Sequence, residues 1–185
     1  QQLAIQHPNT ANPDDAVSMA TDSLISLSLT VTDRDGDAVS SSVNIASNLV
    51  FKDDGPHLGT SSGGEATITV DETNLAVDNT GSFAAFLGAA GAGYGADGAG
   101  TTVYALNVSS AGAASGLFDV ATGNQIYLYK VGATIVGKVG SGPATPNPSG
   151  ATAFVVSVDA SGVVTLDQQL AIQHPNTANP DDAVS

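Results

Sequence analysis

Cysteine and tryptophan are both absent from the 185 residues of this chain, and aromatic residues make up only 5% of it. Without cysteine the chain has neither disulfides nor thiolate metal sites. No apolar run approaches the roughly 20 residues that a membrane-spanning helix needs, so we expect no membrane insertion. No N-terminal signal peptide is visible, but a segment from within a longer array would carry none.

Basic residues are also scarce. The chain has 18 acidic residues and four basic ones, which gives a formal net charge of −14; the basic residues are Arg34, Lys52, Lys130 and Lys138. Without a basic patch to neutralise phosphates, we expect no nucleic-acid partner. Self-repulsion of this size opposes compaction unless counter-ions bind. Highly soluble and halophilic proteins also carry acidic surfaces, so charge alone leaves that interpretation open.

One stretch of sequence occurs twice. Residues 1–18 and 168–185 both read QQLAIQHPNTANPDDAVS, and the copies begin 167 positions apart (168 − 1 = 167). Repeats this similar are typical of a spacer or a multivalent surface protein, because an enzyme seldom needs its catalytic unit in tandem. We therefore expect the chain to cover one period of an array, with an overlap of 18 residues.

The hydrophobic pattern breaks at residues 52–65, KDDGPHLGTSSGGE, where Pro, Gly and Ser dominate. We interpret this stretch as an inter-repeat linker. Residues 1–51 would then be the C-terminal part of one repeat, and residues 66–185 the N-terminal part of the next. The two parts could close on each other within one chain, as in a circular permutant. Alternatively, they could complete themselves head to tail in a neighbouring chain.

Short alternating segments predict strands throughout the chain. Residues 23–32 alternate polar and apolar side chains, and with the turn DRDGD (33–37) they predict an antiparallel hairpin over 23–47 whose apolar face is half-buried. Further strands are expected at 66–70, 101–108, 125–129, 133–139, 153–158 and 163–172. The Gly- and Ala-rich stretch 81–100 is expected to form a loop or an irregular strand. This pattern predicts an all-β fold, an antiparallel β-sandwich with extra strands and long loops.

The hairpin turn is the first candidate metal site. Asp33, Asp35 and Asp37 alternate around Gly36, and calcium prefers six to eight oxygen ligands. The pattern is not an EF-hand, because the glycine comes early and position twelve is Asn44. The alternative is an ordinary Asp-Gly turn whose extra acids keep the tip solvated.

A second group of acids flanks the predicted linker. Asp53 and Asp54 lie at its beginning, and Asp71 and Glu72 follow it. Carboxylates on both sides of a linker could hold a bridging calcium ion that fixes the angle between two domains. The alternative is a solvated, flexible linker.

Signals for catalysis or small-molecule binding are weak. No acid has an arguable partner and substrate pocket, so we expect no enzymatic activity. His7 and His174 occupy the same repeat position beside proline, where a structural role is the simpler interpretation. Tyr104, Tyr127 and Tyr129 could form a sugar-stacking face, but packing is the simpler role for them.

The order of the motifs resembles a known family. TVTDRDGD (30–37), FKDDGP (51–56), VDE (70–72), GVVTL (162–166) and QHP (173–175) follow one another as in the tandem repeats of giant RTX adhesins, which Gram-negative bacteria secrete through type I systems. The resemblance implies an immunoglobulin-like β-sandwich extender domain with calcium bound within and between repeats. It assigns Asp33, Asp35, Asp37, Asp53, Asp54, Asp71 and Glu72 as calcium ligands.

These observations lead to one expectation about function. We expect a calcium-stabilised extender repeat of an extracellular, cell-surface adhesin that serves adhesion or biofilm formation. Its partners would be neighbouring repeats of the same protein, with head-to-tail self-association of this chain as a further possibility. The alternative is a ligand-binding module, for instance for carbohydrate, that is repeated for avidity.

Overall fold

The computed structural model of the chain describes residues 3–174. These residues form strands, turns and three short 3₁₀ helices, with no α-helix among them. No helix in this part of the chain is long and apolar enough to cross a membrane. The chain divides into a first unit, Gln1–Gly59 with Gly91–Gly100, and a second unit, Thr60–Ala90 with Thr101–Ser185. The boundary between Gly59 and Thr60 falls inside the predicted linker 52–65, whereas residues 91–100 cluster with the first unit and not with the predicted part 66–185. Each unit is described separately below.

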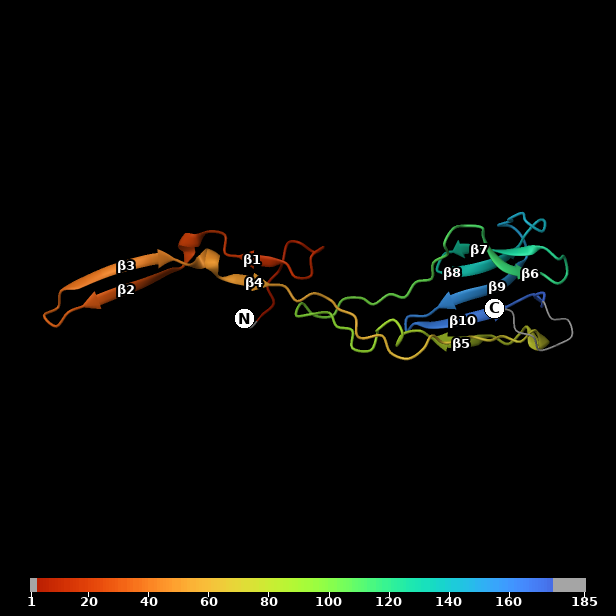
Figure 1. The fold of residues 1–185 in the computed structure, drawn as a ribbon, viewed down its shortest axis with the longest axis horizontal. Coiled ribbons are helices and arrows are strands. Elements are labelled where there is room, and N and C mark those ends of the chain that lie inside the picture. Colours follow the sequence, from red (N-terminus) through yellow and green to blue (C-terminus); the bar gives the residue numbers. More distant parts are fainter. Residues whose placement is uncertain (1–2, 175–185) are drawn as a thin grey trace. The chain divides into compact units, whose positions relative to one another are not determined.

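The first unit contains two small antiparallel sheets. Strands β1 and β4 pair with each other, and strands β2 and β3 form the hairpin that the sequence predicts (Figure 1). Two 3₁₀ helices, η1 and η2, lie at the base of the hairpin. The bounds are β1 Ala16–Ser18, η1 Asp22–Leu24, β2 Ser26–Thr32, β3 Ala38–Asn44, η2 Ala46–Asn48 and β4 Val50–Lys52.

The apolar face of the hairpin is exposed rather than half-buried as expected. The register places Leu27 opposite Val43 and Val31 opposite Val39, so one face is apolar and the other carries Ser and Thr. Apolar side chains on this face are 56–70% exposed; they are Leu27, Leu29, Val31, Val39 and Val43. Side-chain alternation identified the strands, but the expected burial needs a second layer, and within the described residues none covers this face.

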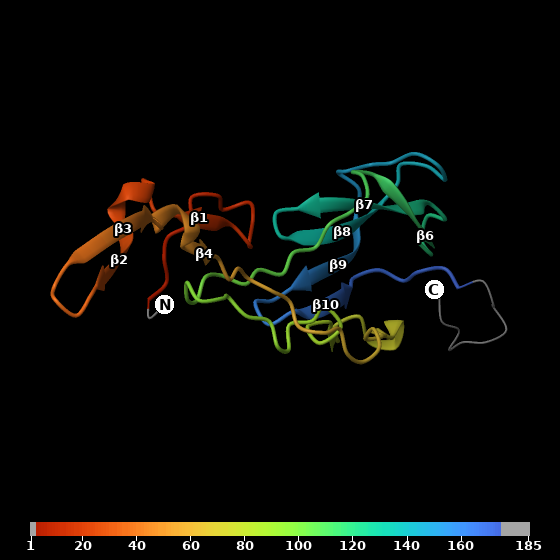
Figure 2. The same cartoon turned by 60° about the vertical axis from the view of Figure 1, so that its left-hand side comes forward.

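The second unit is built on a six-stranded antiparallel sheet with the order β5-β10-β9-β8-β7-β6 (Figures 1 and 2). Strands β6 to β10 follow one another as a meander, and β5 adds to β10 at the other edge. The bounds are η3 Glu72–Asn74, β5 Asn79–Ser82, β6 Ala113–Phe118, β7 Gln125–Val131, β8 Thr134–Val139, β9 Thr152–Val158 and β10 Val163–Gln168.

Local turn chemistry sets the register of this sheet. Strands β7 and β8 are joined by Gly132 and Ala133, and Gly132 adopts a φ of +60°, which glycine at the first position of a two-residue hairpin turn permits. Between β9 and β10, Asp159 Oδ1 accepts hydrogen bonds from the backbone N–H groups of Ser161 and Val163. Both hairpins match the strands predicted at 125–129, 133–139 and 153–158, whereas β10 ends at Gln168, four residues before the end of the strand predicted at 163–172.

The main core cluster of the second unit combines residues of β7, β8 and β9 with Ile172. Ile126 and Ala153 are completely buried, and Val139, Phe154 and Ile172 complete the cluster. Gly137 lets the Phe154 ring approach, because a Cβ atom at Gly137 would lie 2.5 Å from that ring. Partly buried side chains surround the cluster: Leu117, Leu128, Val156, Leu166 and Leu170. The all-β prediction is confirmed, and the curled antiparallel sheet is consistent with a β-sandwich.

Two predicted strands do not form. Residues 66–70 and 101–108 have no strand pairing. Ala66 and Ile68 instead pack against β5 at Gly81, and Val103, Tyr104 and Leu106 line a cavity. Strands β1, β5 and β6 are short or rich in Gly, Ala and Ser, and the hydrophobic pattern gave no sign of them.

Truncation of Ile126 tests the core. We expect Ile126→Ala to lower the free energy of unfolding of the second unit by about 2–5 kcal/mol, because it leaves a cavity in a fully buried site. The measurement is urea unfolding followed by circular dichroism. Val131→Ala on the same strand is the control; Val131 is 56% exposed, so its truncation should cost at most about 0.5 kcal/mol. Equal losses in both variants would contradict the assigned core.

Candidate metal centre

The candidate metal centre lies at the tip of the β2–β3 hairpin. Strand β2 ends at Thr32 and β3 begins at Ala38, so residues 33–37 form the turn. The Asp33 N–H donates to the Asp37 carbonyl at 2.9 Å, and the Gly36 N–H donates to the Asp33 carbonyl at 3.3 Å. Gly36 adopts a φ of +106°, which side-chain-bearing residues rarely adopt, so glycine is required for the turn to fold back.

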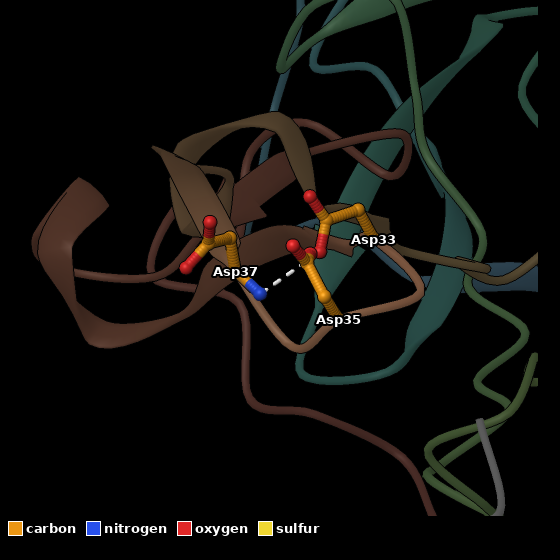
Figure 3. Close-up of side chains that lie close together, drawn as sticks. All are labelled: Asp33, Asp35 and Asp37. Carbon is orange, nitrogen blue, oxygen red and sulfur yellow. Dashed lines mark hydrogen bonds between the residues drawn. The ribbon is translucent and has the colours of Figure 1, made fainter.

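This turn brings three carboxylates together (Figure 3). One oxygen from each of Asp33, Asp35 and Asp37 lies within 4.8 Å of the other two, and all three residues are exposed. Calcium binds oxygen at 2.3–2.6 Å, so two ligands of one ion cannot be more than about 5.2 Å apart. The three carboxylates meet this limit. Among the described residues they are the one group of three or more acidic or histidine side chains whose ligand atoms lie within 4.8 Å of one another.

The Asp33 carboxylate also stabilises the turn. Its Oδ1 accepts hydrogen bonds from the N–H groups of Gly36 (3.1 Å) and Asp37 (2.9 Å). The side-chain hydrogen bond with Asp35 and these backbone donors hold the pKa of Asp33 below its ordinary value. Asp33 is therefore ionised at neutral pH.

The donor set suits a hard cation. Three carboxylates offer up to six oxygens, and water can complete the six to eight ligands that calcium prefers. All three are exposed, so solvent competes at each position and the affinity should lie in the weak range of extracellular modules. The turn is thus suited to a structural ion at high calcium concentration.

The acids at the beginning of the predicted linker, Asp53 and Asp54, are not part of this cluster. Asp53 Oδ1 accepts the N–H of Asp54 at 2.9 Å. The Asp53 N–H donates to the Asp15 carbonyl at 2.8 Å, which continues the pairing of β1 and β4. These acids belong to the first unit, and their role in a bridging metal site stays a prediction.

The acids that follow the predicted linker belong to the second unit and already accept hydrogen bonds. Asp71 caps η3 by accepting the Thr73 N–H at 2.8 Å, and the hydrogen bonds from the Thr73 side chain and backbone lower the pKa of Asp71. Glu72 Oε2 accepts the Ile172 N–H at 3.1 Å, and its Oε1 lies 3.4 Å from His174 Nε2. Glu72 therefore has a structural role that the sequence did not indicate.

The structure also contains an apolar cavity that sequence analysis missed. It lies in the second unit, has a volume of about 660 Å³ and is lined chiefly by Phe83, Phe86, Leu87, Tyr104, Val158 and Val164. The signal was available, because Phe83, Phe86 and Leu87 have the spacing of one helical turn. That turn forms, with the Leu87 N–H donating to the Phe83 carbonyl at 3.0 Å.

The tyrosines do not form a shared sugar-stacking face. Tyr127 is only 4% exposed, and Tyr129 is half-buried, with its hydroxyl group near Gly112. Tyr104 lines the cavity. The packing interpretation is therefore confirmed for Tyr127.

The fold and the site define a class of protein: an all-β chain with a recurring segment and an acidic hairpin tip. The chain belongs to the family called domain of unknown function DUF5801, whose model matches residues 1–46 and 67–185. No curated protein and no solved structure matches this chain.

Neutralising two of the three carboxylates tests the metal centre. In the double variant Asp35→Asn, Asp37→Asn, we expect at least about tenfold more calcium to be needed to shift the Gly36 amide signal in a ¹H–¹⁵N NMR titration, because two charged ligands are lost. Asp33 is left intact because it holds the turn.

The matched control for that titration is Asp97→Asn. Asp97 is exposed, belongs to the first unit and lies outside the cluster. It should leave the midpoint of the calcium titration unchanged. The metal centre is wrong if the double variant and this control titrate alike.

Proposed function

We propose that the chain is a structural, calcium-binding extender repeat of a bacterial cell-surface adhesin. The observation that carries this proposal is the identity of residues 1–18 and 168–185, which is the mark of a tandem array. An array of spacer units projects a terminal binding region away from a cell surface, and it needs no chemistry of its own. The proposed role is therefore mechanical rather than enzymatic.

Charge and geometry support calcium as the proposed cofactor. A net charge of −14 opposes compaction, and bound divalent cations would offset it. The hairpin tip offers three converging carboxylates. Asp53, Asp54, Asp71 and Glu72 complete the proposed ligand set, at the junction between repeats.

The proposed location is extracellular, on the bacterial surface, where calcium is abundant. Inside the cell, where free calcium is low, the same acidic chain would be looser and easier to secrete. Its proposed partners are neighbouring repeats of the same protein. The excess of acidic over basic residues makes nucleic acid an unsuitable partner.

Thermal unfolding with and without calcium tests this function. At a tenfold excess over the dissociation constant, one site adds about 1.4 kcal/mol of stability, which for a chain of this size raises Tm by about 3–6 °C. Two or more sites should raise Tm by about 10 °C. The measurement is a melt in calcium, in excess chelator and in magnesium. No rise specific to calcium would remove the proposed mechanism.

A second candidate function is a repeated ligand-binding module, which the apolar cavity favours. Phe86 and Tyr104 offer aromatic surface there, and Glu65 adds a carboxylate. Such a module would gain affinity through repetition, because linked sites bind with a high effective concentration.

An oligosaccharide-binding screen separates the two candidates. The extender proposal predicts no saturable binding to the wild-type chain. The second candidate predicts binding that Phe86→Ala removes and that Leu58→Ala, which truncates an exposed apolar side chain in the first unit, leaves intact. Saturable binding with this pattern of variants would favour the ligand-binding module.

A further inference from the structure

The two copies of the recurring segment make contacts through different residues. In the C-terminal copy, the first six residues, 168–173, are built into the second unit. Ile172 is 9% exposed and belongs to the core cluster. Its N–H donates to Glu72 Oε2, the Val120 N–H donates to the Ala171 carbonyl at 3.1 Å, and the Gln173 N–H donates to the Phe118 carbonyl at 2.8 Å.

These contacts form a defined docking site. Phe118 ends β6, which is an edge strand of the six-stranded sheet, so the segment adds backbone hydrogen bonds where the edge would otherwise be open. Leu170 packs against the same core cluster as Ile172. The docking site therefore recognises an extended backbone and two apolar side chains, Leu170 and Ile172, spaced two residues apart.

In the N-terminal copy, the last six residues, 13–18, are built into the first unit. Strand β1 pairs with β4, with Ala16 opposite Lys52. The Asp15 and Pro13 carbonyls accept the N–H groups of Asp53 (2.8 Å) and Gly55 (3.1 Å). A Cβ atom at Gly55 would lie 2.3 Å from Pro13 Cβ, so the close approach of these two stretches requires glycine.

The beginning of the N-terminal copy has a different environment from its counterpart. Leu3 is 83% exposed, whereas the equivalent Leu170 is partly buried against the core. Ile5 is half-buried, whereas the equivalent Ile172 is buried. Positions 3–6 of the segment thus have different surroundings in the two copies.

We propose that one copy of the segment makes both sets of contacts at once, and that residues 1–6 of this chain dock on the second unit of another copy of the repeat. The two sets use segment positions 1–6 and 13–18, so no residue serves twice. The six positions between them, fully extended, span at most about 20 Å. This inference rests on the repeated architecture of the proposed function but not on calcium.

Charge favours this partner. The segment carries no acidic residue before Asp14, whereas the chain has a net charge of −14. An uncharged strand can approach an acidic unit without like-charge repulsion.

Peptide binding to the full chain tests the proposal. In the double variant Ile5→Asp, Ile172→Asp, neither copy can bury a charge in the apolar core site, so the site is open. We expect a fluorescein-labelled peptide QQLAIQHP to bind this variant saturably in an anisotropy titration. The peptide QQLADQHP should bind at least about tenfold more weakly. Equal binding of the two peptides would overturn the proposed recognition of the segment.

The single variant Ile172→Asp is the matched control, because its N-terminal copy is intact. We expect it to bind the labelled peptide more weakly than the double variant does, since residues 1–6 compete for the site. If both variants bind the peptide equally, the N-terminal copy does not dock and the proposal fails.

Thermal unfolding of the double variant tests the proposal even if Ile172→Asp unfolds the second unit. The peptide QQLAIQHP should then raise Tm, and QQLADQHP should not; no rise with either would overturn the proposal. Each titration is run in calcium and in chelator. If docking fails while the wild-type chain keeps its calcium-dependent rise in Tm, only the docking inference is lost.

Discussion

Burial of Ile172 connects several separate parts of the second unit. Its side chain enters the core beside Ile126 and Phe154, although it lies beyond the last strand of the sheet. Its N–H is held by Glu72, 100 positions away in sequence. The stretch that carries Ile172 also supplies backbone hydrogen bonds at the end of β6. One short stretch, residues 168–173, therefore contributes to the core, forms backbone hydrogen bonds at the edge of the sheet and donates a hydrogen bond to Glu72 in η3.

The first unit is organised under a different constraint. An isolated two-stranded hairpin is marginally stable in water, and this one has an exposed apolar face and an acidic tip. Local hydrogen bonds compensate in part: Asp22 accepts from the Ser47 hydroxyl and N–H, which tie η1 to η2 and lower the pKa of Asp22. Repulsion at the tip acts against these contacts, and a bound cation would turn it into attraction.

Sequence predicted the elements that depend on local chemistry. Alternation and turn residues located β2, β3 and the two hairpins of the sheet, because a strand's face and a tight turn are both encoded within a few residues. The convergence of Asp33, Asp35 and Asp37 followed from the same turn. Residues 66–70 and 101–108 have equally good strand patterns, but they pack by side chains without a pairing partner. The sequence could not predict that these two stretches have no strand pairing or that Glu72 accepts a hydrogen bond from Ile172, since both depend on contacts between residues far apart in the chain.

The recurring segment also shows that local sequence does not determine structure, because its two copies are identical in sequence but have different surroundings. Leu3 is exposed and Leu170 is packed, so the surroundings rather than the sequence decide the outcome. Contacts constrain nearly the whole segment: positions 1–6 in the second unit, and positions 9–18 in the first, where the Asn9 and Asn12 side chains accept N–H groups of the turn before β1. A segment that makes both sets of contacts, as proposed, would tolerate few substitutions along its length, and the two copies do not differ at any position.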